Sequence, residues 1–254
     1  MAHDFQYQAR DLLNIIDKSI ASQQGRLEHP GIPASPTRRM DAGAIGCLVA
    51  SYPLQIYNPE DQLILQTTKF LMDKYFLHDT FYHELSHSGI NIYLTLHIAQ
   101  VLLRAGQERF FKIVKAVAGF ATPTGQWPEA IHPRTRGGCM GDGQHVWASA
   151  EWVMMMRNMF VREEIAQGLL ILCSGIPQEW IKPNEKLFLG PAQTLYGPIE
   201  VRMDIKEDQI IISWQGRWHQ VPPKIEIRLP GYASYVVKDN ETSIKFNMTR
   251  EIIA

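Results

Sequence analysis

The spacing of apolar residues changes near residue 180, and this change constrains the fold more than any other feature of the chain. Before this point apolar residues recur every three or four positions, which is the repeat of an amphipathic helix. Six segments carry this repeat: residues 4–24, 41–52, 60–76, 90–104, 108–120, and an apolar region over 144–172 that we expect to break near Arg162. Short turns such as residues 104–107 join neighbouring helices, which predicts antiparallel helical hairpins.

After residue 185 the repeat shortens to two positions, as in a strand with one buried face. Five segments show it: residues 198–205, 209–214, 224–229, 232–237 and 243–248. Gly, Pro, Asp and Asn stand between them and indicate turns. We therefore predict a mainly α fold, with a helical-hairpin domain over residues 1–182 and a small antiparallel, β-sandwich-like module over residues 183–254.

Composition argues against several classes of partner. The 254 residues contain 25 Lys and Arg against 26 Asp and Glu, so there is no overall basic field to hold nucleic acid or an anionic membrane. The cysteines Cys47, Cys139 and Cys173 are widely spaced and odd in number, which favours reduced thiols over disulfides. Neither a signal peptide nor a long apolar run is visible. We expect a cytoplasmic protein that uses no cofactor.

One short motif suggests a metal site. His83-Glu84-Leu85-Ser86-His87 matches the H-E-x-x-H pattern of zinc peptidases, in which two histidines one helical turn apart bind zinc and the glutamate acts as base. The surrounding sequence looks like a loop, and no third ligand follows in a recognisable pattern. A zinc peptidase is therefore an alternative, and our main expectation is that the chain has no metal site.

The segment over residues 121–161 is richer in chemistry. A loop dense in Gly, Pro, Trp, His, Glu and Arg separates two helices, and such loops often carry binding and catalytic groups. Trp127 offers an apolar face that could stack on a sugar ring. Glu129 follows Pro128, whose fixed φ stiffens the backbone that holds the carboxylate. His145 and Trp147 lie where the next helix begins.

The order of these residues resembles that of a known family. T-G-Q-W-P-E-A, a Gly-rich loop and G-Q-H-V-W-A-S-A-E-W are similar to the last hairpin of the six-hairpin (α/α)6 glycosidases, which include glucoamylase-like enzymes, processing α-glucosidases and debranching enzymes. Residues 33–43 resemble another loop at the mouth of that barrel and place Arg39 and Asp41 there. Residues 89–106 resemble a further hairpin helix. The resemblance covers roughly residues 30–200 and implies about half of an (α/α)6 toroid.

The resemblance also implies a function. Such enzymes cleave a glycosidic bond between an acid and a base carboxylate, and inverting ones activate water with the base. By its position Glu129 corresponds to the general base. Arg39, Asp41, Trp127, His145 and Trp147 correspond to substrate-binding residues for an α-linked glucan or oligosaccharide.

The half barrel leaves alternatives open. The general acid of the family comes from the half that this sequence does not show, so self-association or an upstream chain would complete the barrel. A non-catalytic carbohydrate-binding or scaffold protein is the second reading. The zinc peptidase is the third.

Overall fold

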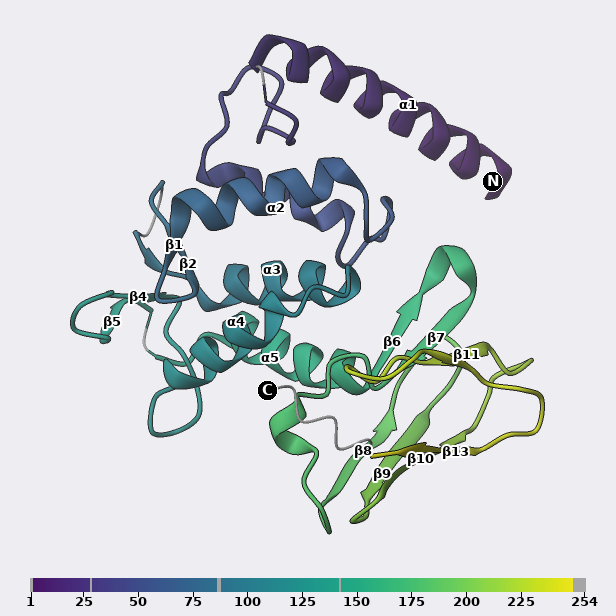
Figure 1. Ribbon diagram of the computed structural model, residues 1–254. Coiled ribbons are helices and arrows are strands. Elements are labelled where there is room, and N and C mark those ends of the chain that lie inside the picture. The colour runs from purple at the N-terminus through teal and green to yellow at the C-terminus, as the bar shows by residue number, and fades with distance from the viewer. Residues whose placement is uncertain (1, 28, 86–87, 142, 249–254) are drawn as a thin grey trace. The chain divides into compact units, whose positions relative to one another are not determined.

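The computed structural model describes residues 2–27, 29–85, 88–141 and 143–248. Two compact units divide the chain between Glu151 and Trp152 (Figure 1). The predicted domain boundary after residue 182 stays a prediction. Each unit is described separately below.

The first unit is built mainly from helices, and all but the first of them bury an apolar face. They are α1 (Ala2–Leu27), the 3-10 helix η1 (Ala42–Ala50), α2 (Gln62–Tyr75), α3 (Ile92–Arg104), α4 (Arg109–Gly119) and the start of α5 (Val146–Phe160). α3 is the most buried of them and packs against α4 and η1, while α2 also packs against η1. Side chains cap three of the N-termini, since Asp41, Asp61 and Asn91 accept from Gly43, Leu63 and Leu94. Helices were predicted at each of these positions.

A small sheet in the same unit was not predicted. Its strands are β1 (Phe76–Leu77), β2 (Thr80–His83), β3 (Gly89–Ile90), β4 (Ala130–Ile131) and β5 (Gly138–Met140), paired in that order. Ile90 lies opposite Ile131, so β3 and β4 join two segments that are 41 residues apart in sequence. The sheet thus holds the loop after β2 and the loop that contains Glu129 in one framework.

Helix α1 differs from the others in exposure. Phe5, Tyr7, Leu12 and Ile15 are all more than half exposed, although the helix has the predicted amphipathic repeat. Among the described residues no helix is both long enough and apolar enough to span a bilayer.

The second unit contains two four-stranded sheets within the described residues. Its strands are β6 (Val161–Glu164), β7 (Leu169–Leu172), β8 (Lys186–Ala192), β9 (Ile199–Ile205), β10 (Gln209–Gly216), β11 (Lys224–Ile227), β12 (Tyr235–Val236) and β13 (Ser243–Asn247), with 3-10 turns η2 (Ile165–Gln167) and η3 (Gln178–Trp180). One sheet has the order β13-β10-β9-β8, and the other has the order β12-β11-β7-β6. The pairing is antiparallel except for β7 and β11, which are parallel.

The prediction of a mainly α toroid is therefore wrong. The described chain is a mixed α and β protein with three sheets, one of them inserted in the helical unit. Residues 161–172, expected to continue the helical region, form the hairpin β6–β7 instead. Gly168 has φ 60 and closes this hairpin in the left-handed region.

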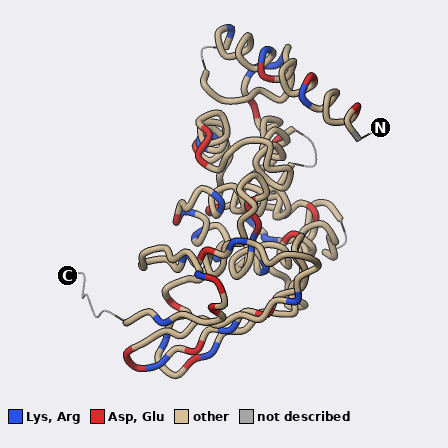
Figure 2. Tube along the Cα trace, turned by 90° about the vertical axis from the view of Figure 1, so that its right-hand side faces the viewer, with Lys and Arg blue, Asp and Glu red and all other residues tan. Residues whose placement is uncertain are grey.

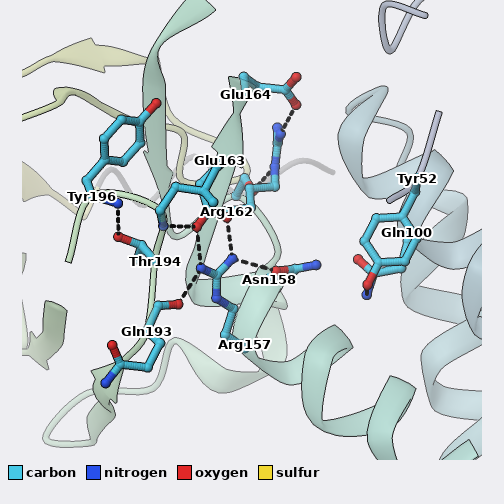
Figure 3. Close-up of polar contacts among 12 residues, drawn as sticks. Tyr52, Gln100, Arg157, Asn158, Arg162, Glu163, Glu164, Gln193, Thr194 and Tyr196 are labelled. Carbon is cyan, nitrogen blue, oxygen red and sulfur yellow. Dashed lines mark hydrogen bonds and ion pairs between the residues drawn. The ribbon is translucent and has the colours of Figure 1, made fainter. Parts of the chain in front are cut away.

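Buried charges are paired in the second unit (Figure 3). The Arg157 guanidinium donates to both oxygens of Glu163, at 2.6 Å each, and to the carbonyl of Gln193 at 2.7 Å. Arg162 pairs with Glu164, and both side chains are about 95% buried. Arg162 also donates to the Ser174 hydroxyl. These pairs connect the end of α5 with β6 and with the segments that follow β7 and β8.

Candidate functional site

A polar cavity of about 520 Å³ lies in the first unit. Three segments line it: residues 38–41 before η1, the last two turns of α2, and residues 84–85 after β2. They contribute two carboxylates, three cationic side chains and two aromatic rings. We call it the Asp41–Glu84 cavity.

Asp41 is fixed at one side of this cavity. Its Oδ1 accepts from the Gly43 amide at 2.8 Å, and its Oδ2 accepts from Arg38 Nε and Nη2 at 3.0 and 2.5 Å. The residue is 8% exposed. The helix cap and the arginine fork therefore hold one carboxylate orientation without a ligand.

Glu84 approaches from the opposite segment. The Glu84 carboxylate lies near the Tyr75 hydroxyl, and both residues line the cavity. The pKa of Tyr75 is raised, first by burial and then by the charges of Glu84 and Asp41. Both carboxylates thus raise the pKa of one phenol, which lines the cavity as a hydrogen-bond donor.

Two cations complete the lining. Arg39 and Lys74 are exposed and form no ion pair with a described residue. With Arg38 they surround the carboxylates with donors, while Phe70 and Tyr75 add flat apolar surface. Paired donors and acceptors beside aromatic rings suit a ligand rich in hydroxyl groups, because each hydroxyl both donates and accepts.

Glu129 belongs to a different loop of the same unit. It is half-buried just before β4 and is not among the residues that line the Asp41–Glu84 cavity. A Cβ placed on Gly141 would lie 3.3 Å from the Glu129 amide nitrogen, so the Gly-rich return of the loop passes directly over Glu129. Glycine is required there for this close approach and for its φ of 75.

Trp127 anchors this loop. Its indole Nε1 donates to the Val117 carbonyl at 2.9 Å, and the side chain is 2% exposed. Its carbonyl accepts from the His145 amide at 2.8 Å. Trp127 therefore connects the end of α4 to the start of α5 and fixes the backbone two residues before Glu129.

His145 and Trp147 gather with two residues of α3 in what we call the Trp147 cluster: Tyr93, His97, His145 and Trp147. The Trp147 ring is 66% exposed and lies 5.5 Å from Tyr93 and 5.9 Å from His145, between ring centroids. Tyr93 in turn lies 4.5 Å from His97. The Nδ1 atom of His145 is buried and has no hydrogen-bond partner among the described residues.

A buried carboxylate lies beneath this cluster. Glu151 accepts from Gln100 at 2.8 Å and from the Tyr52 hydroxyl, and it lies 3.9 Å from His97 Nε2. Burial raises the pKa of Glu151 and lowers the pKa of His97 to about 4. A neutral His97 is thus the ground state at physiological pH.

This arrangement predicts an acid sensitivity. The folded protein resists protonation of His97 whereas the unfolded chain accepts it, so stability is lost as pH falls from about 6.5 to about 4. Protonation of Glu151 acts in the opposite direction, because it relieves a buried charge. At about 1.4 kcal/mol per pKa unit, we expect His97 to lower the free energy of unfolding of the wild type by about 2–3 kcal/mol over this range. His97→Gln should not show this decrease.

Chemical unfolding at pH 7 and pH 4 measures this difference. The matched control is His3→Gln on the exposed face of α1, which should keep the wild-type dependence. Identical pH dependences for the wild type and His97→Gln would contradict the expectation.

The structure thus distributes the predicted site residues over three places. Arg39 and Asp41 share the Asp41–Glu84 cavity, His145 and Trp147 share the Trp147 cluster, and Trp127 and Glu129 share the anchored loop. Lys74 and Tyr75 were missed, and Glu84 was noticed only as part of the zinc motif. Glu151 lay inside the quoted W-A-S-A-E-W run but drew no attention, because nothing in that run indicates burial beside His97.

The zinc motif does not have the expected local structure. His83 is the last residue of strand β2, so it does not begin the helical turn that the motif requires. His87 and Ser86 lie outside the described residues. Within the described residues no three His, Cys, Asp or Glu side chains gather as a metal site would require.

The fold and cavity define a mixed α and β protein with a polar, carboxylate-bearing pocket. No known protein family matches the sequence, and no curated protein matches it. Among solved structures, a wild-type glycosidase matches 60% of this chain at 15% identity with a TM-score of 0.46. A glycosidase variant in complex with glucose matches to the same extent at 14% identity. The chain covers 45% of each of these glycosidases, and the similarity is distant.

Proposed function

We propose that this chain is a carbohydrate-active protein that binds a saccharide in the Asp41–Glu84 cavity. The observation that carries the proposal is that Asp41, Glu84 and Tyr75 line one open polar cavity together with cationic side chains. The carboxylates accept from sugar hydroxyls, Tyr75 and the cations donate to them, and Phe70 packs on the C–H face of the ring.

Hydrolysis is the finer part of the proposal. A saccharide that extends from the Asp41–Glu84 cavity to the loop of Glu129, which lies outside that cavity, meets Glu129 there as the general base of an inverting glycosidase. The acid comes from outside this chain. Support comes from the similarity of the T-G-Q-W-P-E-A segment to glycosidase loops and from the rigid support that Trp127 and Gly141 give to Glu129.

Binding without turnover is the second candidate. It is favoured by the state of Asp41, whose two oxygens are already used by Gly43 and Arg38. A carboxylate whose two oxygens already accept hydrogen bonds is held in position and is poorly placed to donate to a leaving group. Release of fluoride from α-glucosyl fluoride separates the two candidates.

Glu84→Gln tests the binding site. We expect affinity for a saccharide to fall by about 10–100-fold, because the variant loses charge-assisted hydrogen bonds of about 1.5–3 kcal/mol. Isothermal titration with glucose, maltose and longer α-linked oligomers measures it. The same variant lowers the pKa of Tyr75, because the charge and hydrogen bond of Glu84 contribute to raising it.

Controls separate this result from general damage. Glu60→Gln changes an exposed carboxylate before α2 and should leave affinity unchanged. A spectrophotometric titration of tyrosine shows whether Glu84→Gln has altered the cavity as designed. Unchanged sugar affinity together with a lowered Tyr75 pKa would exclude this cavity as the binding site.

A further inference from the structure

We propose that the second unit carries a separate binding site for a neutral oligosaccharide, in a cavity of about 800 Å³ beside strand β10. The end of β10, the segment over residues 217–223 and the turn over residues 237–242 line it. Its volume lies in the range of about 300–1,000 Å³ that is typical of ligand sites. The inference does not depend on saccharide binding in the first unit. We call it the Trp214–Trp218 cavity.

Two indole rings share one face of β10 here. Trp214 and Gly216 are two residues apart on the strand, so they point to the same side. A Cβ on Gly216 would lie 2.0 Å from Trp218 Cζ2, which means that the Trp218 ring occupies the space of the missing side chain. Trp214 and the Trp218 ring therefore lie on the same side of the strand, and we call these two rings the aromatic strip.

One ring of the aromatic strip is buried in the core, and the other is partly accessible to a ligand. Trp214 is 6% exposed and anchors one end in the core, while Trp218 is half-buried and presents part of its ring. Val221 is 80% exposed beside Pro222 and Pro223, so apolar surface continues over the neighbouring segment. Flat indole surface with apolar edges suits the C–H faces of sugar rings.

The opposite wall is polar and already ordered. Glu241 accepts from the Lys238 amide at 2.8 Å and from the Tyr235 hydroxyl at 3.0 Å. The Thr242 carbonyl accepts from the Trp214 amide at 3.0 Å, which ties the turn to β10. The cavity is therefore formed before any ligand arrives, and binding does not require ordering of this turn.

Two side chains at the tip of this turn are available for recognition. Asp239 and Asn240 are exposed, and their side chains make no hydrogen bond with a described residue. Together they offer carboxylate and amide acceptors and an amide donor, the groups that hydroxyls need.

The charges of the lining select for a neutral ligand. Lys224 and Lys238 balance Asp239 and Glu241. Acidic and basic residues are likewise interspersed along the described chain (Figure 2). Neither a polyanion nor a cation is attracted by such a balanced lining. A neutral oligosaccharide matches the aromatic strip, the hydroxyl-binding wall and the absence of net charge.

Fluorine NMR of the full chain labelled with 5-fluorotryptophan tests this proposal. The six tryptophans give separate signals, each assigned by a single Trp→Phe variant. Maltotetraose, cellotetraose and xylotetraose are the probes. We expect at least one of them to shift the Trp214 and Trp218 signals in a saturable manner below about 10 mM, the weak end of specific affinity.

Three variants make the test specific. Asp239→Ala is expected to weaken binding by about 10-fold or more, through loss of one charged hydrogen bond, without touching the core. Trp218→Ala should weaken it by about 10-fold or more. Trp180→Phe, at an exposed position elsewhere in the unit, should leave it unchanged. Glu84→Gln, which alters the other cavity, should also leave the Trp214 and Trp218 shifts unchanged.

The opposing outcomes are distinct. Silent Trp214 and Trp218 signals with all three probes would overturn the proposal, even if Trp147 or Trp127 responds. Equal affinity for the wild type and Asp239→Ala would also overturn it. Saturable shifts with a proline-rich peptide but not with the sugars would assign the cavity to peptide binding and refute the saccharide site.

Discussion

Replacing Glu129 by glutamine is expected to slow saccharide hydrolysis by about 10²–10⁴-fold, which is the usual contribution of a general base. The amide keeps the shape of the carboxyl group but cannot take the proton from the attacking water. The loop should survive the change, because Trp127 and its bond to Val117 fix the backbone. Sugar affinity in the Asp41–Glu84 cavity should change little.

The substrate that makes this measurement decisive is α-glucosyl fluoride. Fluoride leaves without a proton, so no acid carboxylate is needed. Water attacks the anomeric carbon, Glu129 takes its proton, the C–O bond forms as the C–F bond breaks, and β-glucose is the product. Fluoride release by the wild type with β-glucose as the first product, and loss of both in Glu129→Gln, would identify an inverting hydrolase.

Glu108→Gln is the matched control. Glu108 precedes α4, makes no capping hydrogen bond with its side chain and is exposed, so its replacement should leave the rate unchanged. If the wild type releases fluoride no faster than Glu129→Gln while both bind sugar, the binding-protein candidate replaces the hydrolase.

Replacing Arg162 by methionine is expected to reduce the free energy of unfolding by about 3–5 kcal/mol. The loss arises because the 95%-buried Glu164 carboxylate would lose its ion pair with Arg162, and the Ser174 hydroxyl would lose the donor Arg162 Nε. Guanidinium or urea unfolding monitored by circular dichroism measures the change. An effect below about 1 kcal/mol, the range of exposed ion pairs, would contradict it.

A double replacement sharpens this result. Arg162→Met combined with Glu164→Leu removes both buried charges, and we expect it to be more stable than Arg162→Met alone. Lys186→Met is the control, since Lys186 pairs with Asp204 at 3.7 Å in a position that is 76% exposed. It should change stability by less than about 1 kcal/mol.

The sequence predicted the helices well because their evidence is local. Residues 60–76, 90–104 and 108–120 were expected to be helical, and α2, α3 and α4 lie within these ranges. The strand repeat likewise located β9 to β13. Periodicity and capping residues such as Asp61 and Asn91 act within a few positions and can be read without tertiary information.

The fold class could not be obtained in this way. Residues 161–172 are almost continuously apolar after Glu164, and such a run is compatible with a buried helix or a buried strand. Strand β7 pairs with β11, more than 50 residues later in the sequence, and this tertiary contact favours a strand over a helix. The sheet β1–β5 has the same origin, because strands of two to four residues are stable only through their partners.

The candidate site likewise contains some residues that the sequence predicted and others that only the structure reveals. Arg39 and Asp41 were expected to bind substrate from their motif, and they share a cavity in the structure. Lys74, Tyr75 and Glu84 join them only because α2 ends beside the loop after β2. No local pattern marks the end of a helix as part of a site, so these residues require the tertiary structure.

The small sheet has a consequence for how such a protein can diversify. Gly89 in β3 leaves room for only a hydrogen beside Ala130 and Cys139, where an added Cβ would lie 3.0 Å from each. The loop that bears Glu84 and the loop that bears Glu129 are therefore connected through this one small sheet. We therefore expect an insertion in either loop to disturb the register of the strands that hold the other.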